Sequence, residues 1–100
     1  MLKHVVLFRF APDVTEAVRQ EEREVFRQSL LDLAGSHSEL VESLEVGFNI
    51  NGHEEWDIAL VGVFADAQSL AAYAGHPDHV AAVGRLKPFL AGRACVDFEE

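Results

Sequence analysis

The strands that this sequence encodes are apolar on both faces, and no other feature limits the fold as strongly. Residues 2–10 and 56–64 alternate with the period of two that is typical of β-strands. In the first run, one face holds Leu2, His4, Val6, Phe8 and Phe10, while Val5 and Leu7 make the other face apolar as well. A sheet covered by helices on one side would leave an apolar patch in water, which a monomer rarely tolerates. The sequence therefore predicts a twofold dimer in which sheet packs against sheet.

Hydrophobic periodicity divides the chain into four strands and two helical regions. The expected strands are residues 2–10, 44–50, 56–64 and 93–99, and helices are expected up to Ala34, over 65–75 and over 77–86. Either Asp13 with Glu16 or Thr15 alone caps the first helix, and Gly35 is expected to end it. The order β-α-β-β-α-β predicts a ferredoxin-like α+β fold with a four-stranded antiparallel sheet, as one domain over residues 1–100.

Charge and composition exclude several classes of partner. The chain has 8 basic and 17 acidic residues, a formal net charge of −9, and its basic residues do not cluster. Nucleic acids and anionic membranes are therefore not expected partners, because both are bound by neutralising phosphate groups. The single cysteine, Cys95, excludes a disulfide framework and favours a reducing compartment. With neither a signal-like N-terminus nor an apolar run of the roughly 20 residues that a membrane helix needs, we expect a soluble cytoplasmic protein.

Three side chains stand where they could carry chemistry. His4 lies on the same strand face as Val6 and Phe8, so its ring either bonds a backbone carbonyl in the core or serves a site. His79 falls in the first turn of the helix that Pro77 begins, where the helix dipole favours a neutral imidazole, although it could simply decorate the helix end. Tyr73 either directs its hydroxyl toward a site between helix and sheet or caps the core.

The sequence gives no indication of a metal or a cofactor. His76 and His79 are three residues apart, but Pro77 between them spoils a shared helical face, and no cysteine or carboxylate completes a ligand set. His76 is expected to shape the turn, and His37 and His53 are expected to be solvated in loops. Phosphate-binding loops, dinucleotide-binding glycine motifs and nucleophile elbows are absent.

Four segments together resemble the stress-responsive dimeric α/β-barrel (Dabb) family. They are residues 4–10, 57–61, 73–80 and 96–98, of which the His-Pro-x-His-Val segment after Tyr73 is the most specific. The resemblance covers essentially the whole chain and implies a ferredoxin-like protomer whose sheet packs on that of its partner. The family includes plant stress-associated proteins, bacterial proteins without an assigned activity, and olivetolic acid cyclase-like polyketide cyclases.

The resemblance to the cyclases also implies roles for individual residues. It implies a pocket between helices and sheet, with His79 as general base, His4 as the strand histidine, and Tyr73 holding the base or the developing oxyanion. The implied chemistry is a cofactor-free aldol cyclisation of a hydrophobic oxygenated compound. Asp57 replaces a pocket histidine of the cyclases, and Phe26 replaces a tyrosine, so a different substrate is expected. We expect Asp57, Phe26 and Ala59 to contact the ligand, and Asp97 to orient a histidine.

Three functions are consistent with these residues. The first is a small-molecule pocket that binds or transforms its ligand and contains His4, Asp57, Tyr73 and His79. The second is a non-enzymatic stress or assembly protein whose dimer is its main property. The third is a cofactor-free oxygenase of similar architecture.

Overall fold

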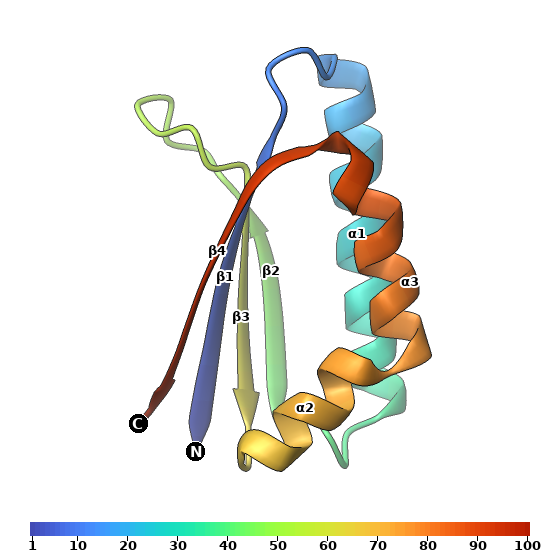
Figure 1. The fold of residues 1–100 in the computed structure, drawn as a ribbon, viewed down its shortest axis with the longest axis vertical. Coiled ribbons are helices and arrows are strands. Elements are labelled where there is room, and N and C mark those ends of the chain that lie inside the picture. Colours follow the sequence, from blue (N-terminus) through green and yellow to red (C-terminus); the bar gives the residue numbers. More distant parts are fainter.

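Two layers make up the fold, a four-stranded antiparallel sheet and a set of helices on one of its faces (Figure 1). The computed structural model describes all 100 residues. The elements in chain order are β1 (Leu2–Phe10), α1 (Glu16–Ser36), β2 (Ser43–Phe48), β3 (Ile58–Phe64), α2 (Ala67–Gly75), α3 (Pro77–Leu86), the 3₁₀ turn η1 (Lys87–Phe89) and β4 (Leu90–Glu99). The strand order is β2-β3-β1-β4, and this arrangement confirms the predicted ferredoxin-like topology.

The core lies between the sheet and the helices. Alternate residues of β1 and β3 are buried on the helix-facing side, and α1 adds Phe26, Leu30 and Leu33. The ring of Phe26 meets that of Phe8 edge to face, with 5.1 Å between the centroids. Each fully buried side chain of this size contributes roughly 1.5–3 kcal/mol through removal of apolar surface from water. The helices therefore hold to the sheet mainly through this apolar layer.

The helix ends differ in part from the expectation. Thr15 caps α1 and accepts a hydrogen bond from the backbone N–H of Val18, which agrees with the second of the two predicted caps. The prediction that Gly35 ends this helix is wrong, because α1 continues through Gly35 and ends at Ser36. The N–H of His37 donates to the carbonyl of Leu33, so the last turn closes without a left-handed residue.

The strands around the β2–β3 loop are shorter than expected. β2 ends at Phe48 rather than residue 50, and β3 begins at Ile58 rather than residue 56. The side chain of Asn49 explains both limits, because its Nδ2 donates to the carbonyl of Trp56 at 2.6 Å and its Oδ1 accepts from the N–H of Asn51 at 2.7 Å. These bonds turn the chain out of the sheet.

Two other boundaries differ by a few residues. β4 begins at Leu90, three residues before the predicted start, and α2 begins at Ala67 rather than residue 65. Asp66 precedes α2 as its N-cap and accepts a hydrogen bond from the N–H of Ser69 at 2.8 Å. A capping residue has extended backbone, so the helix proper can start only after it.

The sheet face that points away from the helices is apolar in its centre and exposed at β4. Val5 pairs with Val61 on one side and with Val96 on the other, so three valines form a row across the strands. Val96 is 62% exposed and Phe98 is 44% exposed. The two-sided apolar character that the sequence predicts is thus present in the folded protomer. No helix is both long and apolar enough to span a bilayer.

Candidate functional site

His4 and Asp97 face each other on neighbouring strands. The register of β1 and β4 pairs these two residues, and Nδ1 of His4 lies 2.5 Å from Oδ1 of Asp97. His4 is only 8% exposed, whereas the carboxylate of Asp97 reaches solvent. A carboxylate on Nδ1 fixes the orientation of an imidazole and leaves Nε2 to act as the acceptor. The partner of the buried ring is therefore a carboxylate from β4, and the structure places Asp97 where it orients a histidine.

Tyr73 and His79 pack against each other at the junction of α2 and α3, with their ring planes inclined by 60°. Their ring centroids are 4.7 Å apart, and Tyr73 also packs on Phe64 at 5.0 Å. Tyr73 is 1% exposed, and its hydroxyl is buried without a hydrogen-bond partner. Burial raises the pKa of Tyr73 to about 12, so the phenol stays protonated and can donate a hydrogen bond. An orphaned buried hydroxyl is costly unless a ligand uses it.

The imidazole of His79 is held in its neutral form. Burial is the main cause that lowers its pKa below the ordinary value of 6.5, and electrostatic interactions with His4 and Arg93 lower the pKa further. The backbone of Ala74 acts in the opposite direction. A neutral ring is what the sequence predicts for this position. A half-buried neutral imidazole can accept a proton from a bound molecule at physiological pH.

Phe64 connects the two histidines and the tyrosine. Its ring meets that of His4 at a centroid distance of 6.2 Å on one side and packs against Tyr73 on the other. Of the three residues predicted as catalytic, His4 and Tyr73 therefore contact the same phenylalanine of β3, and His79 joins them through Tyr73. Together with Asp97 we call them the histidine cluster.

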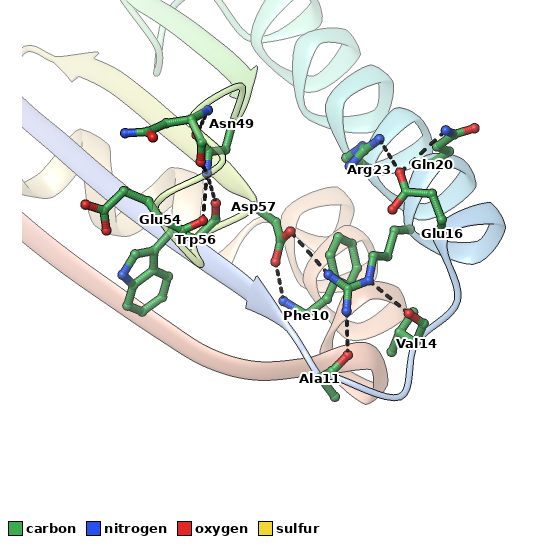
Figure 2. A network of polar contacts seen from close by, with 12 residues as sticks. Phe10, Ala11, Val14, Glu16, Gln20, Arg23, Asn49, Glu54, Trp56 and Asp57 are labelled. Atoms are coloured by element: carbon green, nitrogen blue, oxygen red, sulfur yellow. Dashed lines mark hydrogen bonds and ion pairs between the residues drawn. The ribbon is translucent and has the colours of Figure 1, made fainter.

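Asp57 lies outside the histidine cluster and joins three segments of the backbone. Its Oδ2 accepts a hydrogen bond from the N–H of Phe10 at 2.8 Å, and its Oδ1 lies 3.5 Å from Nη1 of Arg19 (Figure 2). Arg19 also donates to the carbonyls of Ala11 and Val14. These contacts fasten the start of β3 to the end of β1 and the first turn of α1, which is an architectural role.

The other two residues expected to contact ligand also lie elsewhere. Phe26 is 2% exposed in the core against Phe8. Ala59 pairs with Leu7 on the outer face of the sheet, where both line a hollow of about 420 Å³ together with Trp56 and Phe48. The main hollows of the protomer are lined by residues other than His4, Tyr73 and His79.

Two features of the structure are not predicted from the sequence. Cys95 lies two residues before Asp97 on the inner face of β4, and its sulfur is 3.6 Å from Nδ1 of His4 and from Oδ1 of Asp97. Glu22 is buried on α1, where it forms a two-pronged ion pair with Arg85 of α3. The spacing of Cys95 and Asp97 could have indicated a shared strand face, but their approach to His4 depends on strand register.

Comparison with known proteins decides the family. The sequence profile of the stress responsive A/B barrel (Dabb) domain matches residues 2–100. The chain belongs to the Dabb family. A comparison with curated proteins gave no match.

Solved structures similar to this Dabb chain include several dimers. A dimeric ferredoxin-like protein of unknown function from Bacteroides fragilis is 36% identical, with a TM-score of 0.94 over 99% of this chain and 95% of that chain. A dimeric ferredoxin-like protein from Thermobifida fusca is 27% identical, with a TM-score of 0.82 over 99% and 90% of the two chains. Hydroxynitrile lyase from Passiflora edulis shares the fold at 10% identity, with a TM-score of 0.72 over 97% and 90%.

Proposed function

We propose that this Dabb protein is a homodimer that binds a small uncharged oxygenated compound beside the histidine cluster and moves a proton on it. The orphaned hydroxyl of Tyr73 carries the proposal, because a buried donor with no partner is available to a ligand oxygen. The neutral imidazole of His79, packed against the same ring, supplies a proton acceptor. The net charge of −9 favours a ligand without negative charge.

The chemistry that fits these groups is an intramolecular aldol reaction. His79 accepts a proton from a carbon next to a carbonyl group, and the enolate carbon then attacks a second carbonyl carbon of the same molecule. The Tyr73 hydroxyl donates a hydrogen bond to the oxygen that gains negative charge. Protonated His79 returns its proton to the alkoxide, so the step consumes and releases no proton overall. His4, oriented by Asp97, adds a second imidazole beside the ligand.

The outer face of the sheet supports the proposed dimer. The row of Val5, Val61 and Val96 would remain in water in a monomer, together with the exposed ring of Phe98. Similar structures from Bacteroides fragilis and Thermobifida fusca are described as dimeric. A partner sheet packed on this face would remove the apolar row from water in both copies.

A second candidate function is assembly without catalysis. The observation that favours it is the position of the apolar hollow of about 420 Å³, which is lined by Leu7, Trp56 and Ala59 rather than by the histidines. In such a protein the dimer itself would be the functional unit, and the histidine cluster would only fill space.

Turnover of neutral β-diketones and β-triketones by the wild type and two histidine variants separates the candidates. His79→Gln should abolish turnover, whereas His53→Gln, in the exposed β2–β3 loop, should leave it unchanged. Ring resonances of His79 should shift on addition of a compound that is bound but not converted. If no compound of the panel is bound or converted, or if His79→Gln converts it as fast as the wild type, the catalytic proposal fails in favour of assembly.

A further inference from the structure

We propose that His4, Cys95 and Asp97 form a binding site for a single Zn²⁺ ion on the inner face of β4. Their candidate ligand atoms, Nδ1, Sγ and a carboxylate oxygen, all lie within 4.8 Å of one another. The site goes beyond the proposed function, because neither Tyr73 nor His79 is a ligand. Sequence spacing does not reveal the site, since His4 and Cys95 are 91 positions apart in the chain.

Strand register holds the three ligands on a rigid scaffold. β1 and β4 are antiparallel, and the register sets His4 opposite Asp97 and Val6 opposite Cys95. Cys95 and Asp97 are two residues apart, so their side chains leave the same face of the strand, and both approach Nδ1 of His4. Ligands mounted on paired strands keep their geometry better than ligands on loops.

Two of the three distances between the ligand atoms match those of a tetrahedral zinc site. With Zn–S at about 2.3 Å and Zn–N and Zn–O at about 2.0–2.1 Å, tetrahedral angles separate sulfur from nitrogen or oxygen by about 3.6 Å. Both distances from Sγ of Cys95, to Nδ1 of His4 and to Oδ1 of Asp97, are 3.6 Å. Only the hydrogen-bonded pair of His4 and Asp97, at 2.5 Å, must open by roughly 0.8 Å when an ion replaces the shared proton. Asp97 is exposed, so its carboxylate is free to make that movement.

The donor set and the access to it favour zinc over harder cations. A thiolate, an imidazole and a carboxylate are ligands for Zn²⁺, whereas Mg²⁺ and Ca²⁺ prefer oxygen alone. Cys95 and Asp97 are exposed because the helix layer does not cover β4. An ion held by three protein ligands here would keep its fourth position open to water, which is the pattern of reactive zinc sites.

A second cluster in the protein provides an internal control. His37, His76 and Asp78 also lie close together, but they include no thiol. Nδ1 of His76 already accepts a hydrogen bond from the N–H of Asp78 at 3.0 Å, where it caps α3. A spectroscopic signal from a metal–thiolate bond would therefore report the Cys95 site alone.

Titration of the chelator-treated, reduced protein with Co²⁺ as a zinc substitute tests the proposal. Wild-type protein should show the ligand-field bands of tetrahedral Co²⁺ and a thiolate-to-metal charge-transfer band, both saturating at one ion per chain. Added Zn²⁺ should remove both signals. Cys95→Ala should lack the charge-transfer band and bind Zn²⁺ more weakly by roughly tenfold or more. His37→Ala, which alters the second cluster, should behave like the wild type.

The proposal is overturned if wild-type protein gives no charge-transfer band, or if Cys95→Ala binds Zn²⁺ as tightly as the wild type. Circular dichroism of Cys95→Ala checks that the variant is folded, as expected for an exposed side chain. Asp97→Asn gives a second test, because loss of the carboxylate should weaken Zn²⁺ binding while the thiolate band persists at higher Co²⁺. His79→Gln should bind Co²⁺ like the wild type, so failure of the aldol proposal leaves this result unaffected.

Discussion

Arg85 of α3 donates two hydrogen bonds to Glu22 of α1, from Nε to Oε2 at 3.0 Å and from Nη2 to Oε1 at 3.1 Å. Glu22 is 7% exposed, whereas the side chain of Arg85 is half exposed. The carboxylate thus lies in the helix–helix contact, and the guanidinium covers it from solvent. This pair links the two long helices, which Figure 1 shows side by side on one face of the sheet.

Removal of Arg85 alone should destabilise the protein more than removal of the whole pair. Arg85→Met leaves the buried carboxylate of Glu22 without a partner, while the double variant Glu22→Leu/Arg85→Met replaces the pair with apolar contact. In urea denaturation, the free energy of unfolding of the double variant should therefore be close to that of the wild type, and that of Arg85→Met should be the lowest of the three. If Arg85→Met were as stable as the double variant, the pair would contribute no more than an ordinary surface ion pair.

The single tyrosine should titrate far above its ordinary range. Burial raises the pKa of Tyr73 from 10.0 to about 12, and the chain has no other tyrosine. The unfolded chain releases the phenolic proton first, so the folded state becomes less stable as pH rises from 10 toward 12, by up to about 3 kcal/mol. Ultraviolet absorbance of tyrosinate against pH measures this directly. A native midpoint near 10 would show that the hydroxyl is open to water.

Asp57 should matter for stability rather than for ligand binding. Asp57→Ala removes the acceptor of the Phe10 N–H and the partner of Arg19, so we expect a loss of about 1–3 kcal/mol. Asp57→Asn keeps an oxygen for the Phe10 N–H and should lose less. Any compound found to bind at the histidine cluster should bind folded Asp57→Asn with unchanged affinity. Weaker binding by that variant would contradict this prediction and would indicate that Asp57 contacts the ligand, as expected from the family resemblance.

The fold was predictable because the residues of its strands alternate between two faces, and this alternation can be recognised locally in the sequence. β1 has the predicted limits, Leu2 and Phe10, since every residue between them follows the period of two. The loop around Asn49 was less predictable, because its side-chain bonds to Trp56 and Asn51, rather than any change in hydrophobicity, end the strand. The predicted helix end at Gly35 was wrong because a local hydrogen bond decides where the helix ends. The N–H of His37 donates to the carbonyl of Leu33, and this bond closes the last turn without a glycine in the left-handed conformation.

The candidate site was predictable only in part, because periodicity gives the face of a strand but not its register. The face of His4 was clear from Val6 and Phe8, but its contact with Cys95 depends on how β1 pairs with β4. Asp57 shows the converse limit. The strand β3 starts two residues later than expected, so Asp57 lies just before it and its side chain turns toward Phe10 and Arg19 rather than toward the histidine cluster.

Charge on the outer sheet face should dissociate the proposed dimer. Val96 is 62% exposed on β4, in the apolar row with Val5 and Val61, so Val96→Lys would place an ammonium group inside a sheet-to-sheet contact. Val80 on α3 is similarly exposed, at 58%, and Val80→Lys is the matched control. Sedimentation at micromolar concentration should give twice the chain mass for wild type and Val80→Lys, and the chain mass for Val96→Lys. A wild-type monomer would contradict the dimer.

Removal of the Tyr73 hydroxyl should separate stability from activity. In the protomer this buried hydroxyl has no hydrogen-bond partner, so Tyr73→Phe loses no bond on folding and should be as stable as the wild type or more stable. If the hydroxyl stabilises a developing oxyanion, the same change should lower kcat by about 10²- to 10³-fold. Leu70→Ala, a change in the partly buried part of α2, is the control, because it should lower stability without a matching loss of kcat. Two results would contradict this role for Tyr73. One is full activity in Tyr73→Phe, and the other is a loss of stability well above 1 kcal/mol, which would mean that the hydroxyl already has a partner in the folded protein.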